Sequence, residues 1–135
     1  MDIRKQRATG RINVTSYNAQ PQDDGGTFTV ADVQVTEEFF GDLAGAGSAR
    51  FISAKEIADG ATHFAGIEKF LGKLGDRSGS FLMRNSGAVT DNVLHSTWHV
   101  IEGSGTEELA GLRGEGGCTP QGYTLDYWFE GQTLE

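Results

Sequence analysis

Apolar and polar residues alternate along much of the chain. In RINVTSY, residues 11–17, Ile12 and Val14 alternate with polar neighbours. This period of two is typical of a strand that buries one face. Seven further segments have the same strand-like composition: FTVADVQVTEEFF (28–40), GSARFISAK (47–55), THFAGIEKF (62–70), SGSFLMRNSG (78–87), VLHSTWHV (93–100), LRGEGGC (112–118) and GYTLDYWFE (122–130).

Turn residues separate most of these segments. The chain holds 20 glycines but only two prolines, so the glycines indicate strand ends and bends more than disorder. The clearest turn dipeptides are Gly41-Asp42, Asp59-Gly60, Gly75-Asp76 and Asp91-Asn92. A meander of eight strands usually removes its exposed edges by closing on itself. We therefore predict an all-β fold, a closed antiparallel eight-stranded barrel.

The only helical candidate is a single turn from Thr106 to Ala110, within the glycine-rich segment GSGTEELAGLRGEGG. We expect residues 103–111 to cover or seal one edge of the barrel. The whole domain is expected over residues 8–130, between an N-terminal tail (1–7) and a C-terminal tail (131–135) whose last two residues could be a cloning remnant.

The same glycine-rich segment carries a family resemblance. GSGTEELAGLRGEG is similar to the Gly-Ser/Thr-Gly, Phe/Leu, Gly-x-x-Gly signature of allene oxide cyclases and plant dirigent proteins. Together with FFGDLAG, FAGIEKF, DRSGSF and YTLDYWFE, it more closely resembles a bacterial family of unknown function, domain of unknown function 3224, in the same barrel group. The resemblance covers about residues 8–130. It implies an eight-stranded, allene oxide cyclase-like barrel with a central cavity, often oligomeric among the plant relatives.

The parity of strand pairing predicts which side chains point inward. A turn at Gly75-Asp76 places even positions of residues 62–70 on the same face as odd positions of residues 78–87. Extended to neighbouring strands, this face gathers most large apolar residues. The candidate ligand-binding residues are Phe51, Phe64, Phe70, Phe81, Met83, Asn85, Trp98, Tyr123, Tyr127 and Glu37. Glu37 joins this face only if the turn near Gly41 has an odd length.

Glu68 lies on the same face and is the candidate catalytic residue. A carboxyl group among aromatic rings should have a raised pKa, since burial disfavours its charged form, and general acids are made in this way. Asn85, Tyr123 and Tyr127 are its candidate hydrogen-bond partners. The alternative is a structural Glu68 that pairs with neighbouring donors and stiffens the core.

Two inward carboxyl groups suggest glycoside hydrolysis, but the expected spacing opposes it. If Glu37 lies opposite Gly47 and Glu68 lies opposite Phe51, the two carboxyl groups are about 13 Å apart along the intervening strand. Glycosidases place their two carboxyl groups roughly 5 to 9.5 Å apart. We therefore expect no glycosidase site.

Charge and histidine spacing exclude other classes of function. The formal net charge of −8 opposes binding to nucleic acids or anionic membranes. His95 and His99 would lie about 13 Å apart on a strand, too far to share a metal ion. With one cysteine, Cys118, and no signal-peptide pattern, we expect a cytoplasmic protein with no disulfide, metal or cofactor.

Two classes of function remain open, together with a third, structural interpretation. The barrel could be a cofactor-free isomerase or cyclase that folds a small apolar substrate into a reactive shape. It could equally be a non-catalytic carrier of a small hydrophobic ligand, or a barrel filled by its own side chains. An outward-facing Trp128 makes a homo-oligomer a further expectation.

Overall fold

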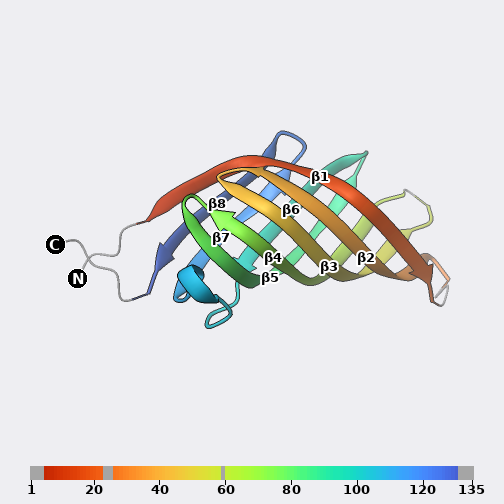
Figure 1. Cartoon of the computed structure of the whole chain (residues 1–135). Coiled ribbons are helices and arrows are strands. Elements are labelled where there is room, and N and C mark those ends of the chain that lie inside the picture. The colour runs from red at the N-terminus through yellow and green to blue at the C-terminus, as the bar shows by residue number, and fades with distance from the viewer. Residues whose placement is uncertain (1–4, 23–25, 59, 131–135) are drawn as a thin grey trace.

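The computed structural model describes residues 5–22, 26–58 and 60–130. Eight strands and one short 3-10 helix follow one another along the chain (Figure 1). Their bounds are β1 Gln6–Pro21, β2 Phe28–Gly41, β3 Leu43–Glu56, β4 Thr62–Leu74, β5 Arg77–Thr90, β6 Val93–Val100, η1 Glu107–Leu109, β7 Leu112–Thr119 and β8 Gly122–Phe129. The predicted tail at residues 131–135, with its suggested cloning remnant, lies outside the described residues.

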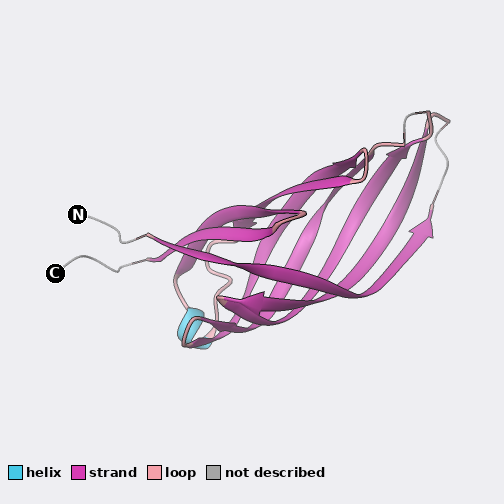
Figure 2. Cartoon of the chain, turned by 90° about the horizontal axis from the view of Figure 1, so that it is seen from above, coloured by secondary structure: helices cyan, strands magenta, loops and turns pink. Residues whose placement is uncertain are grey.

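The strands form a closed antiparallel barrel. Each strand pairs with its neighbour in sequence, and β8 pairs with β1 to complete the ring (Figures 1 and 2). All eight predicted strands are present, and the predicted fold class is confirmed. β1 begins at Gln6, two residues before the expected start of the domain. Among the described residues, no helix is long and apolar enough to span a membrane.

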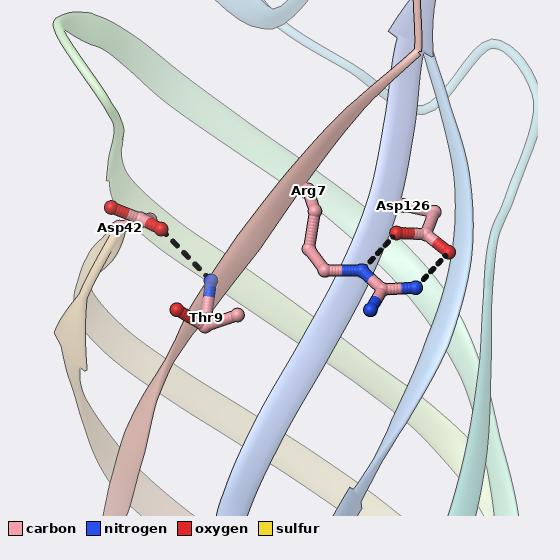
Figure 3. Close-up of polar contacts among 4 residues, drawn as sticks. All are labelled: Arg7, Thr9, Asp42 and Asp126. Atoms are coloured by element: carbon pink, nitrogen blue, oxygen red, sulfur yellow. Dashed lines mark hydrogen bonds and ion pairs between the residues drawn. The ribbon is translucent and has the colours of Figure 1, made fainter.

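Polar contacts reinforce the junction at which the barrel closes. Arg7 on β1 donates from Nε and Nη2 to the two carboxylate oxygens of Asp126 on β8, at 2.7 and 3.0 Å (Figure 3). On the other side of β1, the backbone N–H of Thr9 donates to Oδ2 of Asp42 at 2.9 Å. Arg7 and Asp126 are exposed, and water screens their attraction, so these contacts orient the closing strand more than they stabilise it.

The predicted inward face is confirmed. Glu68 pairs with Met83, Phe70 with Phe81, and Asn85 with Trp98 across neighbouring strands, and all six side chains are buried. Only Asp42 separates β2 from β3, so the connection has the odd length that places Glu37 on this face as well. At one end of the barrel the interior is packed solid by a cluster that includes the following side chains: Phe39, Leu43, Phe70, Phe81, Met83, Leu109, Leu112, Tyr123, Leu125 and Phe129.

The glycine-rich segment seals the packed end, as the sequence predicts. Beyond the end of β6, Ser104 and Thr106 take the place of a neighbouring strand along β5: their hydroxyl oxygens accept from the backbone N–H groups of Leu82 and Ser80, each at 3.0 Å. The η1 turn that follows inserts Leu109 into the core, where it is fully buried. The segment therefore covers the edge of β5 and closes the packed end of the barrel.

The opposite end of the barrel is built differently. Strands β1 to β5 are 13 to 16 residues long, whereas β6, β7 and β8 have eight residues each. In the described pairing, β1 leaves β8 after Gly10 and continues to Pro21 beside β2 alone. Residues 93–95 of β6 likewise pair only with β5. The long strands therefore extend past the short ones (Figure 2), and at this end the described parts of β1 and β6 that pass beyond β8 and β7 do not pair with each other.

Candidate functional site

An apolar cavity of about 200 Å³ occupies the open half of the barrel. Its walls come mainly from aliphatic and aromatic side chains of six strands, β1 to β6, among them Val33, Val35, Phe51, Phe64 and Leu94. Phe51 and Phe64 meet edge to face, with ring centroids 5.2 Å apart. The lining also has polar groups, and we call four of the residues that carry them, Glu37, Glu68, Asn85 and Trp98, the polar floor.

Asn85 and Glu68 are joined within the polar floor. The Nδ2 atom of Asn85 on β5 donates to Oε1 of Glu68 on β4, at 3.0 Å. Both side chains are buried, and only 1% of Glu68 is exposed. Asn85 is therefore the hydrogen-bond partner that the sequence predicts for Glu68. The two other predicted partners, Tyr123 and Tyr127, use their hydroxyl groups elsewhere.

The two carboxyl groups lie much closer together than the sequence suggested. Glu68 pairs with Ala49, not with Phe51, whereas Glu37 pairs with Gly47 as expected. The two residues are thus offset by two positions along β3, about 7 Å at roughly 3.3 Å per residue. Their side chains approach each other closely enough for Glu37 to raise the pKa of Glu68. The expected separation of about 13 Å is wrong, because parity fixes the face of a strand but not its register.

The surroundings of Glu68 favour its protonated form. Its pKa is raised to about 9, first by burial and then by the nearby carboxyl group and negative charge of Glu37, whereas the bond from Asn85 opposes the shift. A protonated carboxyl group can donate to a neighbouring carboxylate, whereas two ionised carboxylates repel each other. Glu68 is accordingly a neutral acid at neutral pH, as the predicted raised pKa required.

Gly47 provides the space for this arrangement. A Cβ atom at this position would lie 2.6 Å from Oε2 of Glu68 and 2.6 Å from Cε1 of Phe39. Oε2 therefore lies directly over the residue that pairs with Glu37, while Oε1 faces Asn85. The two oxygens of Glu68 differ in their surroundings: Oε1 accepts from Asn85, whereas Oε2 lies over Gly47 and has no hydrogen-bond partner among the described residues.

Three buried polar atoms of the floor have no hydrogen-bond partner among the described residues. They are Oε2 of Glu68, Oδ1 of Asn85, which is an acceptor, and Nε1 of Trp98, which is a donor. Buried polar atoms are nearly always paired, so each unpaired atom requires an explanation. Asn85 and Trp98 face each other across β5 and β6, and both line the cavity.

Five of the predicted ligand-binding residues lie away from the cavity. Phe70, Phe81 and Met83 belong to the packed end. The hydroxyl of Tyr123 accepts from the backbone N–H of Leu43 at 2.9 Å, and that of Tyr127 donates to Gln6 at 3.2 Å. The cavity includes the other six candidates, listed here with Glu68: Phe51, Phe64, Asn85, Trp98, Glu37 and Glu68.

The sequence did not point to Tyr17 and Cys118 as cavity residues. Strict alternation puts Tyr17 on the outer face with Thr15, but a β-bulge between Val14 and Ser16 shifts the phase and turns it inward. Cys118 lines the cavity from β7, and burial raises the pKa of its thiol to about 11, with Glu37 and Glu68 adding to the shift. A low thiolate population makes it a poor nucleophile.

His95 and His99 are exposed, as the alternation of their strand predicts. Within residues 5–22, 26–58 and 60–130, no three His, Cys, Asp or Glu side chains gather as a metal site would require. Trp128, expected to face outward, is half-buried, and the ammonium group of Lys5 lies 4.9 Å from the centre of its ring.

These features define a class of protein: a small closed barrel, packed at one end and hollow at the other, with an acid pair at the cavity floor. The chain belongs to the family described as protein of unknown function, DUF3224, whose sequence model matches residues 8–130. The predicted family is thereby confirmed. The wider grouping with allene oxide cyclases and dirigent proteins stays a prediction.

A solved structure shares the fold. It is the crystal structure of a protein with unknown function from the DUF3224 family of Shewanella oneidensis MR-1. The TM-score is 0.72 at 23% sequence identity, over 97% of this chain and 100% of the other. At this level of identity the likeness concerns the fold alone. The chain matches no curated protein.

Proposed function

We propose that the open half of the barrel binds a small, largely apolar molecule. The observation that supports this proposal is the difference in packing between the two ends of the barrel interior. The packed end is filled by aromatic and aliphatic side chains, whereas the open end keeps a cavity with apolar walls. Pockets that are mostly apolar, with a few convergent polar groups, are typical of small-molecule sites.

The size of the cavity limits the ligand. An apolar cavity of about 150 Å³ engineered into another protein accepts benzene. A cavity of about 200 Å³ therefore suits a molecule somewhat larger than benzene, such as a monosubstituted benzene with a short side chain. The exposed side chain of Tyr17, 65% accessible, lies at the open wall, where such a molecule would enter.

A catalytic role is the second candidate, and the neutral carboxyl group of Glu68 favours it, because a buried acid can protonate a substrate oxygen. One observation ranks binding first: Oε1 of Glu68 already accepts from Asn85, so the carboxyl group is held against the wall of the barrel.

Binding can be tested with propylbenzene as the probe and a pair of adjacent substitutions. Leu94 lines the cavity, whereas Val93 next to it faces outward. Leu94→Trp should fill the cavity and weaken propylbenzene binding at least tenfold, as measured by calorimetry or NMR titration. Val93→Trp adds the same side chain on the outer face and should leave the affinity within a few-fold. A wild-type protein that binds neither propylbenzene nor polar benzene derivatives of similar size would refute the proposed function.

A further inference from the structure

The unpaired donor and the unpaired acceptor of the polar floor lie side by side. Asn85 and Trp98 are direct partners across β5 and β6, and the Cβ atoms of such partners are about 4.5–5.5 Å apart. Oδ1 of Asn85 can only accept a hydrogen bond, and Nε1 of Trp98 can only donate one. A single ligand group that both donates and accepts could satisfy the two atoms together.

The orientation of the Asn85 amide is fixed by the carboxyl groups behind it. Oε1 of Glu68 accepts a hydrogen from Nδ2 of Asn85 at 3.0 Å, and the nearby Glu37 helps to keep Glu68 protonated. Nδ2 is therefore turned toward Glu68, and Oδ1 is the atom of the amide that has no partner. Glu68 and Glu37 are thus positioning residues, because they determine that Asn85 presents a hydrogen-bond acceptor to a ligand.

We propose that the ligand carries an uncharged carboxamide or lactam group, whose N–H donates to Oδ1 of Asn85 and whose carbonyl accepts from Nε1 of Trp98. This inference rests on the proposed function, because it concerns the polar end of the molecule held in the same cavity. The apolar remainder of the ligand lies against Val33, Val35 and Phe64.

Other polar groups fit the floor less well. An ammonium group only donates, so it leaves Nε1 of Trp98 unpaired. A carboxylate only accepts, so it leaves Oδ1 of Asn85 unpaired, and the negative charge of Glu37 repels it. A hydrocarbon leaves both atoms unpaired, and each buried atom without a partner weakens binding. An amide is complementary to both atoms.

Four probes of similar size test the inference: phenylacetamide, phenylacetate, 2-phenylethylamine and propylbenzene. We expect phenylacetamide to bind at least tenfold more tightly than the anion and the cation. Propylbenzene and phenylacetamide differ in the free energy of leaving water, so their affinities for the wild-type protein cannot be compared directly. The change in their relative affinity between the wild type and a variant removes this difference. In Asn85→Leu and in Trp98→Phe, the affinity for phenylacetamide relative to that for propylbenzene should fall at least tenfold.

The indole N–H signal of Trp98 gives a direct readout by NMR, with Trp98→Phe identifying the signal. Formation of a hydrogen bond should move it downfield with phenylacetamide but not with propylbenzene. Two substitutions test whether Glu68 positions Asn85. In Glu68→Gln, the glutamine amide can donate toward Glu37 and accept from Asn85 as the protonated acid does, so this variant should keep the preference for phenylacetamide, whereas Glu68→Leu should lose it.

The melting temperature of each variant shows whether it is folded. If Glu68→Leu does not fold, the shift of the Trp98 N–H signal in the wild-type protein tests the inference instead.

The outcomes separate the two proposals. If none of the four probes binds, the proposed function fails and the inference fails with it. If propylbenzene binds in the cavity, but the relative affinity for phenylacetamide is unchanged in Asn85→Leu and Trp98→Phe, only the inference is overturned. A preference for 2-phenylethylamine or phenylacetate overturns it equally.

Discussion

The side-chain amide of Asn85 donates to the carboxyl group of Glu68 across 3.0 Å, in the middle of a barrel lined by apolar side chains. The bond joins β5 to β4, and Glu37 extends the polar contact to β2. A fully ionised acid pair in this place would be costly, because buried charges lose their hydration. One retained proton removes most of this cost, and several properties of the protein follow from it.

The stability of the protein should depend on pH through Glu68. Its pKa is about 9 in the folded state and 4.5 without burial, so the folded state holds the proton more tightly. The stabilisation is therefore complete below pH 4.5 and is lost as the pH rises through 9. Relative to Glu68→Gln, which cannot titrate, the wild-type free energy of unfolding should fall by up to about 1.4 kcal/mol per pH unit between pH 5 and 8.

Denaturant unfolding of both proteins across this range measures the difference directly. Cys118, whose thiol pKa is raised in part by Glu68, is present in both proteins, so only the part of its contribution that depends on Glu68 differs between them. Parallel stability curves for the two proteins would mean that Glu68 carries no proton at neutral pH.

Gly47→Ala should destabilise the barrel. The added methyl group would lie 2.6 Å from both Glu68 and Phe39, and these side chains are buried and cannot move away freely. Overpacking of this kind costs about 1–3 kcal/mol. Ser48→Ala, on the exposed face of the same strand, is the matched control and should stay within about 0.5 kcal/mol of wild type in thermal unfolding. Equal stability of Gly47→Ala and wild type would show that Glu68 does not occupy this space.

Tyr123→Phe should lower stability far more than Tyr127→Phe does. The hydroxyl of Tyr123 is the partner of the buried backbone N–H of Leu43, and it also donates to the carbonyl oxygen of Phe40 at 2.9 Å. Its removal leaves a buried donor unpaired, at about 1–3 kcal/mol. The hydroxyl of Tyr127 bonds only to the exposed side chain of Gln6. Denaturant midpoints of the two variants provide the comparison, and similar values would contradict the structural role of Tyr123.

The segment that seals the packed end should contribute to stability through Leu109. This side chain is fully buried between the η1 turn and the core, so Leu109→Ala should cost about 2–5 kcal/mol. Leu71, 59% exposed on β4, allows the same substitution at the surface, and Leu71→Ala should cost less than about 0.5 kcal/mol. Calorimetric melting of the two variants tests this, and a small effect at Leu109 would mean that the segment is not part of the core.

The sequence by itself determined the strands, their number and the residues that point inward. Alternation with a period of two is a local property, so the face of Phe70 or Trp98 could be assigned without knowledge of the distant chain. The same reasoning placed Glu68 and Asn85 on one face and predicted the raised pKa, because a carboxyl group among aromatic residues has only that outcome. The family resemblance gave the closed barrel independently.

Only the tertiary structure decided the distances within the site. A shift in register by two residues preserves every inward face, so no local pattern could show that Glu68 pairs with Ala49 and reaches Glu37. The bulge that turns Tyr17 inward depends likewise on the pairing of β1 with β2. The cavity itself arises because five long strands extend past three short ones. The strand lengths alone do not locate it, because the unfilled end is defined only by the pairing of all eight strands in the closed barrel.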